Sequence, residues 1–219
     1  TNLKAYNEII HYDNFLNSYW NSIKYTFTGT ALALVINLLT AYPLSKGYLR
    51  GRRTFNFYFV FTMMFGGGLV ASYMNLKSLG LTGTIWAVLL PACCNAYYLI
   101  LTRTFFEQVP IEMEESAKID GASGSQTLFK VIIPNVMPAI TTCTFLTLTN
   151  SFKLFDQNLA LTGGLPSVIQ NGAKVNVTEL LALNIYSTYN ISKKYHGAAQ
   201  AKAVIFFILV AVLAIAQQA

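Results

Sequence analysis

Five long apolar stretches limit what this chain can fold into more than any other feature of its sequence. They run over residues 25–44 (bounded by Pro43), 55–74, 84–101, 131–148 and 201–215. A bilayer core about 30 Å thick is crossed by a helix of about 20 apolar residues. In lipid, a single segment must also satisfy its own backbone hydrogen bonds, which a helix does. The stretches therefore predict an all-α transmembrane protein with about five membrane-spanning helices, the last of them barely long enough.

The composition supports a membrane protein and excludes other classes. The chain is 54% hydrophobic and only 11% charged, whereas soluble domains carry about 25% charged residues. Intrinsic disorder requires the opposite balance. The chain has an odd number of cysteines, and all of them lie in apolar segments: Cys93, Cys94 and Cys143. We interpret them as small core residues rather than as a disulfide or a metal site.

The basic residues predict the orientation in the membrane. The formal net charge is +6, and the loop between the first two stretches contains no acid. Its basic residues are Lys46, Arg50, Arg52 and Arg53. Because lysine and arginine collect in cytoplasmic loops, we expect this loop and loop 103–130 inside, with loop 149–200 and the N-terminus outside. An N-terminus outside the cell without a signal peptide is unusual. We therefore expect that the given sequence lacks an upstream helix and a C-terminal tail.

Loop 103–130 has the pattern of two short helices joined by a glycine turn. It holds five of the chain's nine acidic residues. Pro110 suits the first position of a helix, and acids in the following turn are favoured by the helix dipole. Gly121 can end that helix in the left-handed conformation, and Ser123 or Ser125 can cap the next one. We expect that second helix to carry Leu128, Phe129 and Ile132 on one side, in a compact cytoplasmic knob.

The sequence contains none of the common signatures of catalysis. It has no phosphate-binding loop of the type G-x-x-x-x-G-K-[ST] and no nucleophile–base signature. His11 and His196 lie outside the apolar stretches without metal-ligand spacing. Almost no ionised groups lie inside the stretches, which argues against a proton-coupled carrier. We therefore predict that the chain is not an enzyme and that it binds no metal or cofactor.

One string in loop 103–130 resembles a known family. Glu115-Ser116-Ala117, three residues, Gly121, nine residues and Val131-Ile132-Ile133-Pro134 resemble the EAA signature of ABC importer permeases. Ser116, Val131 and Ile133 depart from the family's residues but keep similar size or polarity. The resemblance implies that residues 1–219 form one transmembrane domain, the core of a type I importer permease, in which this helix–turn–helix is the coupling loop.

The resemblance also implies partners and roles. ATP and Mg would be used by a separate cytoplasmic ATPase subunit that receives the loop. The chain would pair with itself or with a homologous permease, and an extracytoplasmic sugar-binding protein would deliver the substrate. The residues assigned to coupling with the ATPase are Glu114, Glu115, Ser116, Ala117, Asp120, Gly121 and Pro134.

A second region narrows the resemblance to carbohydrate importers. Residues 150–164 resemble the segment after the EAA loop in maltose-type and multiple-sugar-type permeases. Residues 65–70 and 79–87 are more similar to the partner subunit of polysaccharide transporters. The family implies a multi-pass protein of a bacterial inner or plasma membrane. A permease for a peptide, amino acid or anion is the alternative, and a membrane scaffold whose acidic loop binds a regulator is another.

Three residues are weaker candidates for the substrate path. Asn95, Asn150 and Phe152 combine hydrogen-bonding groups and a flat apolar face, which sugars require. The competing interpretation for each is an interhelical hydrogen bond or core packing.

Overall fold

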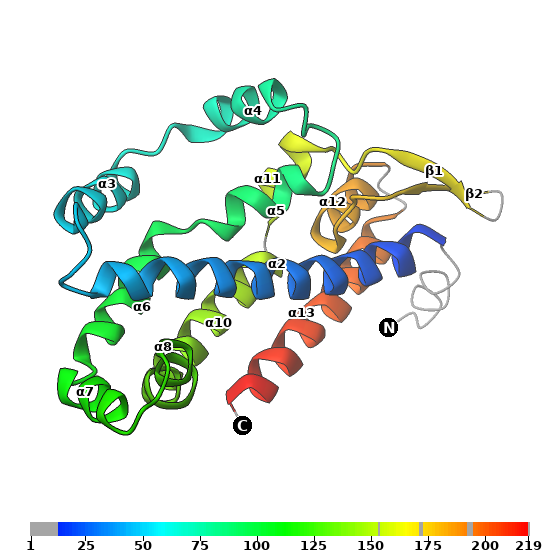
Figure 1. Cartoon of the computed structure of the whole chain (residues 1–219). Helices are drawn as coiled ribbons and strands as arrows, with labels where there is room; N and C mark the ends of the chain where they lie inside the picture. The colour runs from blue at the N-terminus through cyan, green and yellow to red at the C-terminus, as the bar shows by residue number, and fades with distance from the viewer. Residues whose placement is uncertain (1–12, 153, 171–172, 192–194, 219) are drawn as a thin grey trace. The chain divides into compact units, whose positions relative to one another are not determined.

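The computed structural model describes residues 13–152, 154–170, 173–191 and 195–218. Helices make up most of this part of the chain (Figure 1). In chain order they are α2 (Asp13–Ser45), α3 (Arg52–Met64), α4 (Gly68–Ser78), α5 (Trp86–Cys93), α6 (Ala96–Gln108), α7 (Ile111–Ile119), α8 (Gly124–Gln126), the π-helix η1 (Thr127–Ile132), α9 (Ile133–Asn135), α10 (Met137–Phe152), α11 (Phe155–Leu161), α12 (Leu181–Ile191) and α13 (His196–Gln218).

The apolar stretches coincide with these helices, which confirms the all-α transmembrane prediction. In the described residues, three helical segments are long and apolar enough to cross a membrane, or up to five if each pair joined by a short break counts as one. The unbroken segments are Phe15–Ser45, Trp86–Gln108 and His196–Ile215. The first was expected to start at residue 25 and to be bounded by Pro43. Instead α2 begins at Asp13 and Pro43 lies inside it, as tolerated in membrane helices, where neighbouring groups satisfy the freed carbonyl.

The fourth apolar stretch is bent because of its prolines. The segments Gly124–Asn135 and Met137–Phe152 meet at an angle of 74°. Pro138 has no N–H to donate to the carbonyl of Pro134, and its ring crowds that carbonyl. The N–H of Val136 is shared between the carbonyls of Ile132 and Ile133, at 3.2 and 3.1 Å. The second stretch is also interrupted, between α3 and α4, where Gly68 has a φ of +74°.

The chain forms two compact units that are interleaved in sequence. The first unit comprises residues 1–30, 67–92 and 148–219, and the second comprises 31–66 and 93–147. In the first, Phe15, Leu181 and Ala201 form a buried cluster where α12 packs along α13. In the second, the buried cluster consists of Ala41, Phe106, Ile132 and Val136. The single domain over 1–219 stays a prediction.

One small element was not expected from the sequence. Strands β1 (Ser167–Gln170) and β2 (Ala173–Asn176) form an antiparallel hairpin, with Ser167 opposite Asn176. It lies in the first unit, next to α12 in Figure 1. The hairpin is short, so the description of the fold as all-α holds.

Candidate functional site

Helix α7 has well-defined ends. Pro110 occupies the N-cap, one position before the helix, and Glu112 and Glu114 lie in its first turn. After the helix Gly121 has a φ of +78°. The N–H of Ala122 donates to the carbonyl of Ala117 at 2.9 Å, and that of Gly121 to Lys118 at 3.1 Å, which is a Schellman motif. Nothing lies within 4 Å of a Cβ built on Gly121, so glycine is required here for its conformation alone.

The second half of the loop is capped as the sequence suggested. The N–H of Gln126 donates to Ser123 Oγ at 3.4 Å, and the N–H of Ser123 donates to Gln126 Oε1 at 2.9 Å, a complete capping box. The chain then continues as the π-helix η1 instead of an α-helix. Its wider turn separates side chains that were expected to share one side: Ile132 is fully buried, whereas Phe129 is 66% exposed.

The inner face of α7 is polar. Within α7 only Glu114 and Ala117 are buried, and Glu114 forms an ion pair with Lys46. The Lys46 ammonium also lies 5.1 Å from the centre of the Tyr42 ring. Burial lowers the pKa of Lys46, and the positive charge of Lys118 lowers it further.

The outer face of α7 forms a stripe of exposed side chains, Ile111, Glu115 and Ile119, which we call the outer stripe. Residues at this spacing share one face of a helix. Ile111 is 64% and Ile119 86% exposed, and Glu115 between them is exposed. Two exposed isoleucines flanking a carboxylate form a surface suited to a protein partner.

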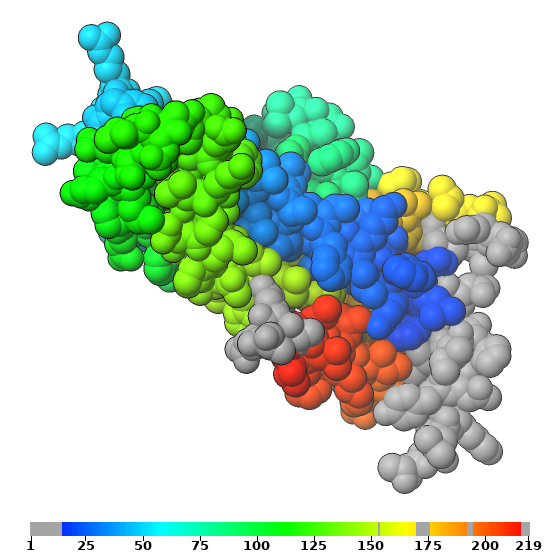
Figure 2. All heavy atoms as spheres, turned by 60° about the horizontal axis from the view of Figure 1, so that its bottom comes forward, coloured from blue at the N-terminus to red at the C-terminus, as the bar shows by residue number. Residues whose placement is uncertain are grey.

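The remaining residues assigned to coupling divide between the two faces. Ser116, Asp120, Gly121 and Pro134 are exposed, and the backbone N–H of Asp120 donates to the carbonyl of Ser116 at 3.0 Å. Glu114 and Ala117 face inward. Most of the predicted set thus lies on the surface, whereas Glu114 and Ala117 are buried. Figure 2 shows the atoms of this part of the chain in green.

A second ionic cluster joins α3 to α6. Glu107, in the last turn of α6, accepts a hydrogen bond from Arg103 Nη2 at 2.7 Å and pairs through the same oxygen with Arg52. Two arginines therefore share one carboxylate, which fixes the start of α3 beside the end of α6.

The three weaker candidates for the substrate path lie outside the loop that carries α7. Asn95 is exposed and caps α6, because its Oδ1 accepts hydrogen bonds from the N–H groups of Tyr97 and Tyr98. Asn150 is exposed on α10. Phe152 is only 3% exposed, and its ring packs edge-on against Phe206 with the ring centres 6.4 Å apart. This contact favours the core-packing interpretation of Phe152, and its place in the substrate path stays a prediction.

Sequence reasoning missed a buried polar network in the first unit. Lys202, 3% exposed on α13, donates at 2.8 Å to Asn184 Oδ1 and at 2.8 Å to Thr188 Oγ1. Asn184 in turn donates to Glu179 Oε1 at 3.2 Å, and Asn176 donates to Glu179 Oε2 at 2.9 Å. The last apolar stretch thus carries the buried ammonium of Lys202, which is linked to the carboxylate of Glu179 through the side-chain amide of Asn184.

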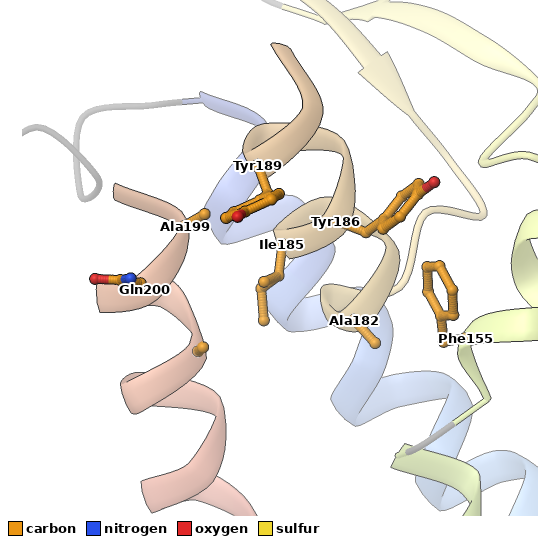
Figure 3. A pocket seen from close by; sticks show the side chains of 8 residues that line it. Phe155, Ala182, Ile185, Tyr186, Tyr189, Ala199 and Gln200 are labelled. Carbon is orange, nitrogen blue, oxygen red and sulfur yellow. The ribbon is translucent and has the colours of Figure 1, made fainter. Parts of the chain in front are cut away.

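A pocket of about 400 Å³ lies against the same helices, lined by residues of α11, α12 and α13 (Figure 3). Its aromatic side chains are Phe155, Tyr186 and Tyr189, and the rings of the first two are 4.9 Å apart. The lining is almost wholly apolar, with Gln200 at one side. In the described ranges, no three His, Cys, Asp or Glu residues are grouped so that they could hold a metal ion.

Comparison with known proteins identifies the family. Residues 24–219 match the family described as binding-protein-dependent transport system inner membrane component. The chain belongs to this family. Helix α7 and its glycine turn contain the string that resembles the EAA signature.

Some of the curated relatives of this chain are named as permeases of carbohydrate transport systems. The polygalacturonan/rhamnogalacturonan transport system permease of Bacillus subtilis is 41% identical over 140 residues, 64% of this chain and 49% of the relative. A probable permease for starch degradation products of Thermoanaerobacterium thermosulfurigenes is 36% identical over 154 residues, 68% of this chain and 48% of the relative. The chain spans about half the length of these relatives.

Solved structures of similar fold include a bacterial ABC transporter described as importing the acidic polysaccharide alginate. One of its chains is 30% identical with a TM-score of 0.86, covering 98% of this chain and 78% of that one. A second structure, of an alginate transporter in complex with an alginate pentasaccharide-bound periplasmic protein, is 14% identical with a TM-score of 0.70. It covers 99% of this chain and 81% of that one, and it supports the fold.

Proposed function

We propose that this chain is the transmembrane permease subunit of an ATP-driven, binding-protein-dependent importer of carbohydrate, with an oligosaccharide as substrate. The observation that carries the proposal is the alginate importer chain, which is 30% identical and covers 98% of the permease. The curated relatives, named for polygalacturonan and for starch products, support the same substrate class.

Coupling to ATP hydrolysis is assigned to α7. The outer stripe would dock in a groove of a cytoplasmic ATPase subunit, which uses ATP and Mg. Three features support this: the helix has well-defined ends, its exposed face carries two isoleucines, and the turn that follows it is set by Gly121. A surface helix with two exposed isoleucines is costly to leave in water and suits burial against a partner.

The proposed assembly follows from the distribution of charge and from the family. The loop before α3 and the loop that carries α7 face the cytoplasm of a bacterial cell, because the first is rich in lysine and arginine. The hairpin β1–β2 and α12 then lie on the outer side, where a sugar-binding protein would arrive. A homologous permease subunit completes the translocation path.

An uptake experiment tests the substrate class. The full-length permease is reconstituted in vesicles with its partner permease, its ATPase subunits and its binding protein. Labelled neutral malto-oligosaccharides, acidic oligogalacturonides and an amino acid are offered with and without ATP inside. We expect ATP-dependent uptake of at least one of the two carbohydrates and none of the amino acid. Uptake restricted to the amino acid, or no ATP-dependent uptake of any solute, would contradict the proposal.

A further inference from the structure

Helix α7 is held to the rest of its unit in an unusual way. Of its two buried residues, Ala117 offers only a methyl group. The larger apolar side chains, Ile111, Met113 and Ile119, are all exposed. Glu114 is therefore the one long side chain with which α7 reaches inward. An α-helix on a protein surface usually buries a continuous apolar face, and α7 has none.

The partner of Glu114 lies at the end of a spanning helix. Lys46 directly follows α2, whose last residues carry Ala41 and Tyr42 into the buried cluster of the second unit. The Lys46 backbone N–H donates to the carbonyl of Pro43 at 3.2 Å. Its ammonium lies against the Tyr42 ring, so backbone and side chain are both fixed to the end of α2. A force applied to Glu114 would reach α2 through this one residue.

We propose that the Lys46–Glu114 ion pair is the link through which a displacement of α7 moves α2. In this role the two side chains hold α7 and α2 together, and neither of them contacts the ATPase. The proposal rests on the coupling function proposed for α7. The chain itself connects α7 to α6 through residues 109 and 110, and α7 also packs against η1. The ion pair adds a connection to α2. It is suited to this because Glu114 is buried, so that its separation from Lys46 would leave a buried charge without a partner.

The loop offers a matched pair of acids for the test. Glu112 and Glu114 both lie in the first turn of α7, so both contribute to the helix terminus in the same way. Glu112 is exposed, whereas Glu114 is 7% exposed and paired. Replacing each by glutamine removes one charge from the same turn, and only the Glu114→Gln change removes the pair.

The experiment uses the complete complex in proteoliposomes. Glu114→Gln, Lys46→Gln, their combination and Glu112→Gln are compared with the wild type for retention of the ATPase, for ATPase activity with and without loaded binding protein, and for substrate uptake. A Lys46→Glu/Glu114→Lys variant restores the pair with its charges exchanged.

We expect the two single variants to retain the ATPase but to lose substrate-stimulated hydrolysis and uptake by about fivefold or more, the lower range of allosteric coupling. The combined glutamine variant should be no worse than either single variant, because both remove the same interaction. The exchanged pair should recover part of the uptake, and Glu112→Gln should match the wild type.

Three outcomes would overturn the inference. One is wild-type uptake in both single variants. Another is loss of the ATPase subunit itself, which would mean that the pair builds the docking surface. The third is additive damage in the combined variant. If the wild-type complex itself neither retains an ATPase nor imports a carbohydrate, it is the proposed function that fails, so the two failures are distinguishable.

Discussion

Each of the two units contains a lysine that is matched to a glutamate, but in different ways. Lys46, which is partly buried, pairs directly with the buried Glu114. Lys202 reaches Glu179 through the amide of Asn184 and also donates to Thr188. The network around Lys202 is satisfied from several elements at once, which makes it a rigid clamp. At α7 a single ion pair takes the place of this network.

The largest expected effect comes from opening the Lys202 clamp. Lys202→Met keeps most of the apolar stem but leaves Glu179 buried without a cation, which should cost about 3–5 kcal/mol of the free energy of unfolding. Denaturant unfolding of the purified permease in detergent measures the change. Adding Glu179→Gln should recover part of the loss.

A matched control for this prediction is Lys130→Met, because Lys130 is exposed and its removal should leave the unfolding free energy unchanged. Equal stability of Lys202→Met and the wild type would show that the network is not a clamp, and the contrast between the units would disappear.

A smaller and more local effect is expected at the turn after α7. Gly121→Ala forces a side chain into the left-handed region, at a cost of about 1–2 kcal/mol. Gly124→Ala is the matched control, since Gly124 has no positive φ and no atom within 4 Å of the added Cβ. Hydrogen exchange should quicken in α7 for Gly121→Ala alone, and the rest of the second unit should be unaffected. Faster exchange throughout that unit would mean that α7 is part of its core.

The smallest effect is expected at the cap of α8. Ser123→Ala removes the acceptor for the N–H of Gln126 and should cost about 1 kcal/mol. Gln126→Ala removes the other half of the same box. If the two bonds act together, the double variant should cost less than the sum of the single variants, again measured by hydrogen exchange in α8 and η1. Strict additivity would show that the two bonds are independent.

The sequence predicted the features that depend on local patterns. The apolar stretches, the glycine turn at Gly121 and the cap at Ser123 are each encoded within a few residues. The different orientations of Glu114 and Glu115 could also have been predicted from helical spacing. Glu115 shares its face of the helix with Ile111 and Ile119. Glu114 lies on the other face, with Ala117. Both acids were instead assigned to the same contact.

The features that were missed depend mostly on contacts between distant residues. Lys202 finds its amide partner 18 residues earlier in the chain, and the burial of Phe152 depends on Phe206. Neither spacing has a sequence signature. The hairpin is different, because the strands are separated in the sequence by Asn171-Gly172, and an Asn-Gly pair between two strands is typical of hairpins.

The most direct test of the account is a cysteine cross-linking measurement on α7 in the assembled complex. The background carries Cys94→Ser, because Cys94 is exposed whereas Cys93 and Cys143 are buried. Ile119→Cys on the outer stripe is compared with Arg53→Cys, an exposed position at the start of α3. The account predicts a cross-link from residue 119 to the ATPase subunit that changes in yield with ATP, and none from residue 53. No cross-link from residue 119 in a complex that hydrolyses ATP and imports substrate would contradict the claim that α7 docks on the ATPase.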